Sequence, residues 1–358
     1  MRILQISSAH SIGGGETHLA GVSNELTKRG HEVFAALRPN AAIARELSAL
    51  PTSNLITLPL RNALDVKSAV NIARFVADKN IELINVHLAR DYPIAALAAA
   101  MNRIPFVITR HVLFPMKRIH RVFLSSVKYV IAPSNAVAEN LRREGIFPPG
   151  KIVTIRYGLD VDKFARQARV THPNVCVGSV GNLDPVKGFD VLIRAAEIVS
   201  KQRPDVKFKI VGEDRSRDGR NENELRNLVA RLRLGSVVEF AGWSDNVRGM
   251  LSGFDVFVSA SRSESFGFVI AEAMLAGVPV IATETDGATE IISDPSLGRL
   301  VQIGSHEAIA NAILELVLDS EKRGQLVQRG RDHIEAAFSL KRTVDETEDL
   351  YQRAIATG

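Results

Sequence analysis

The chain has 358 residues, of which 46% are hydrophobic and 24% are charged, a composition that is ordinary for a globular protein and a length that favours two domains. Its single cysteine, Cys176, excludes an intrachain disulfide and a cysteine-based zinc cluster, and no His, Cys and carboxylate residues have metal-ligand spacing. The longest apolar run, 93–101, is about half the length that spans a bilayer. A strand pattern starts at residue 2 and leaves no room for a signal peptide, so we expect a cytoplasmic protein.

The charge is unevenly distributed along the chain. The net charge is +5, but residues 1–170 carry 23 basic and 12 acidic residues, whereas the remainder carries 22 and 28. This excess predicts that the first half faces an anionic partner, either a membrane surface or a charged acceptor. Residues 110–128, which mix basic and apolar residues, fit a helix on an anionic bilayer or, preferably, a helix whose apolar face is packed in the core. No nucleic-acid-binding pattern is found, so we expect no nucleic acid partner.

The first half alternates strands and helices. The pattern predicts a strand over 2–7, a glycine-rich turn over 10–15, a helix over 16–29, and later a helix over 63–78, a strand over 81–87, a helix over 95–101 and a strand over 105–109. The turn contains Gly13-x-Gly15, but His18 occupies the third glycine position of a dinucleotide fingerprint. Gly30-His31-Glu32-Val33 leads into a second strand. Arg38 lies at its end, where an acidic residue would bind the ribose of NAD, so NAD binding is disfavoured.

A histidine ends the strand over 105–109. Because ligands bind at the carboxyl ends of parallel strands, His111 is a candidate site residue, although it also fits a simple strand-end cap. His87 ends the neighbouring strand and is a weaker candidate.

The second half repeats the alternation, with strands predicted over 175–181, 208–212, 237–242, 256–258 and 280–282. Between the last two strands lie a polar loop with Glu264 and a helix over 268–276 that contains Glu272. The segment Ser265-Phe266-Gly267-Phe268 opens that helix, and backbone N–H groups at a helix N-terminus favour a phosphate. Carboxylates on either side suit sugar and ribose hydroxyls. Two solvated surface glutamates are an equally good interpretation of these residues alone.

The same stretch carries a resemblance to a known family. Glu264-x7-Glu272, followed by Ala-Met-x-Ala-Gly-x-Pro-Val-Ile-Ala-Thr, resembles the donor-binding signature of the retaining glycosyltransferases of family 4. This resemblance implies that Glu264 holds donor-sugar hydroxyls, that Glu272 holds the ribose, and that the backbone of Phe266, Gly267 and Phe268 faces the diphosphate.

Other segments are similar to the same family. The turn with Gly14, Gly15 and Glu16 resembles its first loop, whose N–H groups touch the diphosphate, and Pro-Phe-Val-Ile-Thr-Arg-His111 resembles its strand ending in a histidine beside the donor sugar.

In the second half the resemblance implies that Lys187 grips the diphosphate, that Glu213 lies by the donor and that the loop of Trp243 lies against the nucleobase. Asn182 stands where the family has Arg, which predicts weaker stabilisation of the leaving group unless another group substitutes. Tyr157 stands where the family usually has Asn.

Together these features predict two doubly wound α/β domains of the GT-B architecture: residues 1–165 on the acceptor side, a linker over 166–173, a nucleotide-sugar domain over 174–340, and a helix over 341–358 that crosses back.

We expect a retaining, metal-independent hexosyltransferase without a cofactor, with His111, Lys187 and Glu264 as catalytic residues. It would serve cell-surface polysaccharide or lipopolysaccharide synthesis. Its partners would be a nucleotide-diphospho-sugar, a saccharide or lipid-linked acceptor, and an anionic membrane face. A non-catalytic nucleotide-sugar-binding subunit, suggested by Asn182, and a nucleotide-sugar epimerase are the alternatives. The base, the sugar, the acceptor and the oligomeric state do not follow from the sequence.

Overall fold

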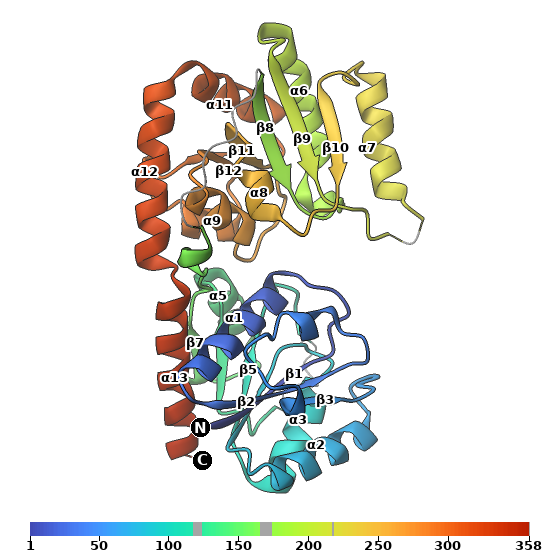
Figure 1. Cartoon of the computed structure of the whole chain (residues 1–358), viewed down its shortest axis with the longest axis vertical. Coiled ribbons are helices and arrows are strands. Elements are labelled where there is room, and N and C mark those ends of the chain that lie inside the picture. Colours follow the sequence, from blue (N-terminus) through green and yellow to red (C-terminus); the bar gives the residue numbers. More distant parts are fainter. Residues whose placement is uncertain (117–123, 165–173, 217, 358) are drawn as a thin grey trace. The chain divides into compact units, whose positions relative to one another are not determined.

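The computed structural model describes residues 1–116, 124–164, 174–216 and 218–357. They form two compact units (Figure 1): Met1–Asp160 with Phe338–Gly358, and Val161–Ala337. The predicted linker over 166–173 and part of the basic segment over 110–128 lie outside the described residues. Within the described residues, no helix is both long and apolar enough to cross a membrane.

Unit 1 is built on a seven-stranded parallel sheet. Its strands occur in the order β3-β2-β1-β4-β5-β6-β7. Most strand residues are buried on both faces, as expected when helices cover a parallel sheet. The strand bounds are β1 Arg2–Ser7, β2 Glu32–Leu37, β3 Leu55–Thr57, β4 Leu83–Val86, β5 Phe106–Thr109, β6 Tyr129–Ala132 and β7 Ile152–Thr154.

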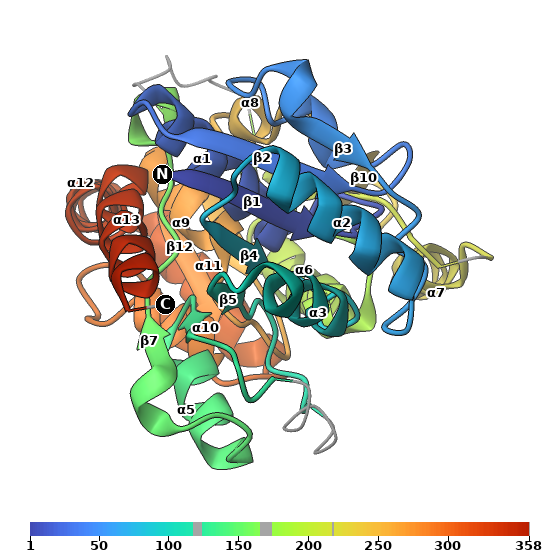
Figure 2. The ribbon, with the colours of Figure 1, turned by 90° about the horizontal axis from the view of Figure 1, so that it is seen from below.

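Two layers of helices cover this sheet (Figure 2). The apolar faces of α2 (Val66–Asp78), α3 (Tyr92–Asn102) and α5 (Asn135–Glu144) pack on one side. Helix α1 (Gly14–Lys28) and the C-terminal helix α13 (Leu340–Ala356) pack on the other. Arg29 fixes this last helix to α1, because its guanidinium pairs with Asp345 at 2.7 Å and Glu348 at 2.9 Å.

Unit 2 contains a six-stranded parallel sheet in the order β10-β9-β8-β11-β12-β13. Its core joins the sheet to α6, α7 and α11, while α8 and α9 pack together and α12 packs against α9. The strands are β8 Val175–Val180, β9 Val206–Val211, β10 Val238–Gly242, β11 Val256–Ser259, β12 Val280–Thr283 and β13 Arg299–Val301. The helices are α6 Phe189–Gln202, α7 Arg220–Arg231, α8 Val247–Leu251, α9 Phe268–Leu275, α10 Asp286–Ile291, α11 His306–Leu318 and α12 Ser320–Ala337.

Both sheets reverse their strand order at a central strand. In unit 1 the chain runs outward on either side of β1, and in unit 2 it does so around β8. Two doubly wound α/β units are therefore present, which confirms the predicted fold class. Such switch points place ligands at the carboxyl ends of the strands.

Several short elements were missed at this level. The helix α10 was not predicted; the hydroxyl of Thr285 accepts the Ala288 N–H and caps its first turn. Within the described residues, the short strands β3 and β13 and five 3₁₀ helices were also missed, since segments of three or four residues carry too little periodicity to be recognised. The 3₁₀ helices are Ala42–Arg45, Thr52–Asn54, Pro149–Lys151, Val161–Phe164 and Pro185–Lys187.

Candidate functional site

The predicted residues of unit 2 gather at the carboxyl ends of its strands. Lys187 ends the 3₁₀ helix that follows β8, and Glu264 lies in the loop that follows β11, the strand adjacent to β8. The ammonium of Lys187 donates to a carboxylate oxygen of Glu264 at 2.6 Å, and both side chains are mostly buried. The two groups that the sequence assigns to a phosphate and to a sugar therefore form an ion pair with each other.

A neighbouring arginine fixes the two loops that carry this pair. The backbone N–H of Arg262 donates to the carbonyl of Val186 at 2.7 Å, directly before Lys187. Its guanidinium makes two parallel bonds to the carboxylate of Asp190, at 2.9 and 2.7 Å. Since bidentate pairs of this kind hold both geometry and charge, Arg262 positions the loops and is not a substitute for the missing Arg at residue 182.

The loop before α9 is held by close backbone packing. Gly267 adopts a φ of +97°, a conformation that favours glycine and turns the chain into the helix. The N–H of Gly287 donates to the carbonyl of Glu264 at 2.9 Å, and a side chain at residue 287 would collide with the backbone of Phe266. The ring of Phe266 is buried, edge-on to that of Phe268 at 5.2 Å, so only the backbone of Phe266 remains for a ligand.

Glu272 lies in the second turn of α9 and is partly buried. Burial raises the pKa of its carboxyl group from 4.5 to about 7, and the charge of Arg248 opposes that rise only in part. No described residue hydrogen-bonds to this carboxylate. An unpaired acceptor of this kind is suited to ribose hydroxyl donors.

Glu213 and Trp243 lie near each other, after the adjacent strands β9 and β10. Arg215 joins them: its Nε donates to Glu213 at 3.1 Å and its guanidinium lies 5.2 Å from the centre of the Trp243 ring. The ring is 49% exposed, which leaves a face open for stacking. The segment that carries Asn182 is joined to Glu213 through the next residue, since the N–H of Leu183 donates to the backbone carbonyl of Glu213 at 2.9 Å.

In unit 1 the glycine-rich turn is closed by its own glutamate. The carboxylate of Glu16 accepts the N–H of Gly13 at 3.0 Å at the start of α1, which is the glutamate half of a capping box, because Gly13 has no side chain to accept a bond in return. Gly14 and Gly15 form the first turn of that helix. Gly15 lies against the ring of His111, since a Cβ there would be 2.9 Å from the imidazole Cγ.

His111 belongs to a buried chain of hydrogen bonds. Its Nε2 is 2.9 Å from His87 Nδ1, and its Nδ1 bonds to the hydroxyl of Tyr157. His87 Nε2 is in turn 2.9 Å from the side-chain oxygen of Gln5. These three bonds are satisfied together when Tyr157 donates to His111, His111 to His87 and His87 to Gln5. Burial, and then the charge of His87, holds the pKa of His111 well below its usual range, so the imidazole is neutral near pH 7.

Three residues of this cluster were not predicted as site residues. Tyr157 was noted only as a departure from the family pattern, His87 was judged a weak candidate, and His18 was noted only for breaking the glycine fingerprint. His18 packs on the Tyr157 ring with centroids 4.6 Å apart, and burial lowers its pKa to about 3. For His87 a topological signal exists, because His87 and His111 follow the adjacent strands β4 and β5, whereas no such signal exists for Tyr157 or His18.

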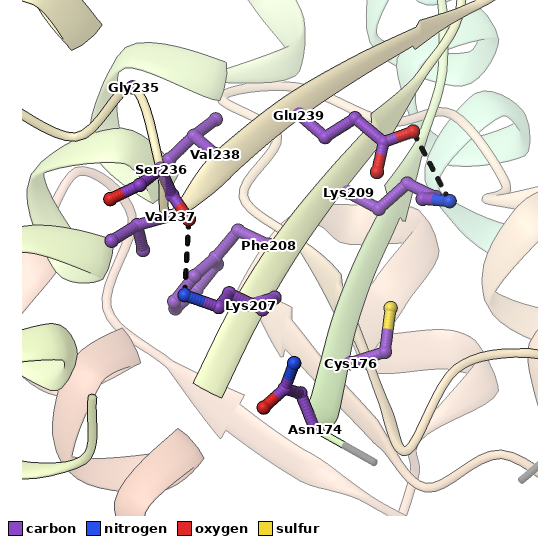
Figure 3. Close-up of a pocket in the computed structure, with 10 residues that line it drawn as sticks. All are labelled: Asn174, Cys176, Lys207, Phe208, Lys209, Gly235, Ser236, Val237, Val238 and Glu239. Atoms are coloured by element: carbon purple, nitrogen blue, oxygen red, sulfur yellow. Dashed lines mark hydrogen bonds and ion pairs between the residues drawn. The ribbon is translucent and has the colours of Figure 1, made fainter. Parts of the chain in front are cut away.

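A separate hollow of about 330 Å³ lies at the opposite edge of the second sheet, near the amino ends of β8, β9 and β10 (Figure 3). Its lysines are engaged: Lys207 donates to the carbonyl of Ser236 at 3.1 Å, and Lys209 pairs with Glu239 at 3.2 Å. It contains none of the predicted site residues. Burial raises the pKa of its Cys176 thiol to about 11, which disfavours the reactive thiolate.

The part of the chain that the structure describes has no group of three His, Cys, Asp or Glu side chains arranged to hold a metal ion. The chain does contain two aspartates two residues apart, Asp160 and Asp162, a spacing that could serve a metal ion. Within the described residues, no third His, Cys, Asp or Glu side chain joins them in a metal-binding group.

The chain was compared with known families and proteins. The model of "Glycosyl transferases group 1" matches residues 160–333, and that of "Glycosyltransferase Family 4" matches residues 12–163. A lipopolysaccharide core biosynthesis glycosyltransferase, LpsE of Rhizobium meliloti (strain 1021), is 34% identical over 169 residues, which are 47% of each chain, so this match spans about half of that relative. The N-acetyl-alpha-D-glucosaminyl L-malate synthase of Bacillus anthracis is 25% identical over 95% of this chain and 94% of its own.

The fold is found in solved structures. The crystal structure of Anabaena Alr3699/HepE in complex with UDP and glucose matches with a TM-score of 0.85, at 22% identity, over 98% of this chain and 99% of that one. The two family models overlap at residues 160–163 and together extend from residue 12 to residue 333, which includes most of both units. The predicted recognition and the predicted GT-B fold are thus confirmed, and the chain belongs to the glycosyltransferases of group 1 and family 4.

Proposed function

We propose that the chain transfers a sugar from a nucleotide-diphospho-sugar to a saccharide or lipid-linked acceptor in the synthesis of a cell-surface polysaccharide or lipopolysaccharide. The observation that carries this proposal is the Lys187–Glu264 ion pair at the carboxyl ends of β8 and β11. It puts one cation and one carboxylate side by side where a sugar phosphate presents an anion next to hydroxyl groups.

Each member of the pair gains a partner when such a donor binds. The ammonium of Lys187 would turn to the diphosphate, and the carboxylate of Glu264 would accept hydrogen bonds from hydroxyls of the transferred sugar. Backbone N–H groups at the start of α9, around Gly267, would add donors to the diphosphate. The partly buried Lys187 acts strongly on a developing charge because water screens it little.

The nucleoside would bind along the same edge of unit 2. The unpaired carboxylate of Glu272 suits the ribose hydroxyls, and the exposed Trp243 ring suits stacking with the base. Glu213 would lie by the donor, and Asn182 would offer an uncharged hydrogen bond to the diphosphate. The neutral amide stabilises the leaving group less than an Arg would.

In unit 1 we assign a positioning role to the turn and to His111. The N–H groups of Gly14 and Gly15, with Glu16 closing the turn, would contact the diphosphate. Because the His111 imidazole is neutral and both its nitrogens are hydrogen-bonded, it cannot act as a cation towards phosphate. Its role would be to present a fixed surface and its adjacent carbonyl to the donor sugar.

The proposed reaction is a retaining, metal-independent displacement. The bond between the anomeric carbon and the diphosphate oxygen breaks, and its electron pair leaves with the diphosphate, which Lys187 stabilises. The acceptor hydroxyl attacks from the face that the leaving group vacates, and its proton passes to the departing phosphate oxygen. Glu264 and His111 orient the sugar for this attack.

The acceptor does not follow from the family, since the relatives named above serve a lipopolysaccharide core and L-malate. The basic first half agrees with a lipid-linked acceptor at an anionic membrane face, with the protein bound there peripherally.

The proposal is tested by incubating the full chain with a panel of UDP-, GDP- and ADP-sugars without acceptor and measuring release of the nucleoside diphosphate. We expect slow turnover of one donor. Lys187→Ala should reduce it at least about a hundredfold, the usual scale for a group that stabilises a transition state. The matched control is Lys201→Ala, which removes an exposed lysine from α6 that pairs with Glu197 one turn away.

A second variant separates the two members of the pair. Glu264→Gln should raise KM for the donor sugar, with little effect on binding of the free nucleoside diphosphate. Binding of a donor by the wild type without any turnover would favour the non-catalytic subunit instead, and retention of turnover in Lys187→Ala would refute the assigned site.

A further inference from the structure

Three cationic or protonatable side chains of unit 1 lie outside the machinery assigned above. Arg38 directly follows β2, His10 lies three residues after β1, and Arg90 lies four residues after β4. These strands are neighbours in the order β2-β1-β4. All three side chains therefore stand at the carboxyl edge of the sheet, where this class of fold binds ligands.

Hydrogen bonds draw the three residues together around one loop. Arg38 Nη1 donates to His10 Nε2 at 2.6 Å. Arg90 Nε donates to the hydroxyl of Ser8 at 2.6 Å, and its Nη2 donates to the carbonyl of the same residue at 2.5 Å. Each guanidinium thus has its orientation fixed by the loop while further N–H groups remain. The two guanidinium groups are partly buried.

The charges of these arginines are not cancelled nearby. Neither Arg38 nor Arg90 forms an ion pair with a carboxylate in residues 1–116, 124–164, 174–216 or 218–357. The acid on which both charges act is Asp91, which is fully buried and accepts the Ser8 N–H at 2.8 Å. Burial raises its pKa, although the charges of Arg90 and Arg38 act in the opposite direction. Asp91 therefore supports the loop through Ser8, and one carboxylate offsets at most one of the two arginine charges.

We propose that His10, Arg38 and Arg90 form a binding site for an anionic group of the acceptor, either a phosphate monoester or a carboxylate. This inference rests on the proposed transferase function and specifies its acceptor. Two guanidinium forks with fixed orientation match the planar or tetrahedral oxygens of such groups. The first 170 residues carry 23 basic and 12 acidic residues, and their net positive charge attracts the same ligands.

The geometry favours a small anion over a membrane surface. Membrane patches attract lipids through exposed, mobile lysines and arginines beside apolar side chains. Here the guanidinium groups are partly buried and are tied to a loop at the ligand-binding edge, so they suit one directed contact. They also follow β1, β2 and β4, whereas the exposed apolar residues Val112 and Phe114 follow β5.

The test is direct binding to the full chain without donor, so that it does not depend on turnover. Calorimetric Kd values are measured for glucose, glucose 6-phosphate and glucuronate, together with UDP. We expect at least one of the two anions to bind about tenfold or more tightly than glucose. The phosphate and carboxylate arms then identify which anionic group the site takes.

Variants assign the binding to these residues. Arg38→Gln, which keeps a donor for His10 but removes the charge, and Arg90→Ala should abolish the preference for the anion and leave the Kd of UDP unchanged. Arg74→Ala, an exposed arginine of α2, is the matched control. Equal binding of glucose and both anions by the wild type overturns the inference, and so does weaker UDP binding in the two variants, because the arginines would then serve the donor.

A vesicle assay covers the membrane alternative. Flotation with vesicles of phosphatidylglycerol and phosphatidylcholine should be the same for wild type, Arg38→Gln and Arg90→Ala. Loss of flotation in these variants with unchanged anion binding contradicts the assignment. Failure of every nucleotide-sugar in the turnover assay refutes the proposed function, and it is distinguished from failure of this site by the anion titrations.

Discussion

The raised pKa of Glu272 makes a quantitative prediction about the stability of unit 2. The carboxyl group titrates at about 7 in the folded chain, against 4.5 for an exposed glutamate. A group whose pKa is raised on folding stabilises the fold when it is protonated. That contribution is complete below pH 4.5 and is lost as the pH rises to 7. Replacing Glu272 by Gln, which is neutral and of similar shape, removes this dependence.

The size of the effect follows from the shift. At about 1.4 kcal/mol per pH unit, a rise from 4.5 to about 7 corresponds to about 3 kcal/mol. Because the side chain is partly open to solvent, the effect is smaller than this limit, on the order of 1–3 kcal/mol at pH 8. We therefore expect Glu272→Gln to be more stable than wild type by that amount at pH 8, and by less than about 0.5 kcal/mol at pH 4.5.

The assay uses the single tryptophan of the chain. Trp243 lies in the same unit as Glu272 and reports on its unfolding. The free energy of unfolding in urea is measured by fluorescence at pH 4.5 and pH 8 without nucleotide. Glu321→Gln, an exposed glutamate of α12, is the control and should stay within about 0.5 kcal/mol of wild type. Equal stability of Glu272→Gln and wild type at pH 8 would refute the reasoning.

Two further predictions concern the departures from the family pattern. Asn182→Arg should raise the rate of donor turnover about tenfold or more, because a second cation would join Lys187 at the diphosphate; an unchanged rate, with donor Kd measured in parallel, would show that the leaving group is already fully stabilised. Tyr157→Phe removes the hydroxyl that bonds to His111, and we expect a lower kcat with little change in donor Kd, because the imidazole loses its fixed position. Loss of donor binding in Tyr157→Phe would instead mean that the tyrosine supports the fold of the site.

The fold could be predicted largely from the sequence because its signals are long. Buried parallel strands such as β8 and β11 are continuous apolar runs, and helices such as α2, predicted over 63–78, have apolar periodicity and a side-chain cap. Helix starts were less accurate. Helix α3 begins at Tyr92, three residues before the predicted start at 95, because its first turn accommodates Pro93.

The candidate site was predicted from two kinds of signal. Lys187 and the role of Glu264 were predicted from the resemblance to family 4, whereas His111 was predicted also because it follows a parallel strand whose end faces the ligand edge of the sheet. Most partners of these residues were not identifiable. Tyr157 reaches His111 only through three-dimensional packing, and His18 packs on the Tyr157 ring from α1. Nothing in local spacing encodes such contacts.

The ion pair between Lys187 and Glu264 shows how the unpredicted contacts bear on selectivity. A free phosphate would have to displace the Glu264 carboxylate from Lys187 and leave that carboxylate without its partner, which costs free energy in a partly buried place. In the proposed binding mode, a complete sugar nucleotide supplies the phosphate for Lys187 and hydroxyl donors for Glu264 at the same time. On that proposal we expect the pair to disfavour fragments and to favour the whole donor, since only the whole donor restores a partner to both groups. In this way a contact that neutralises both residues in the free chain becomes a reason for specificity in the proposed reaction.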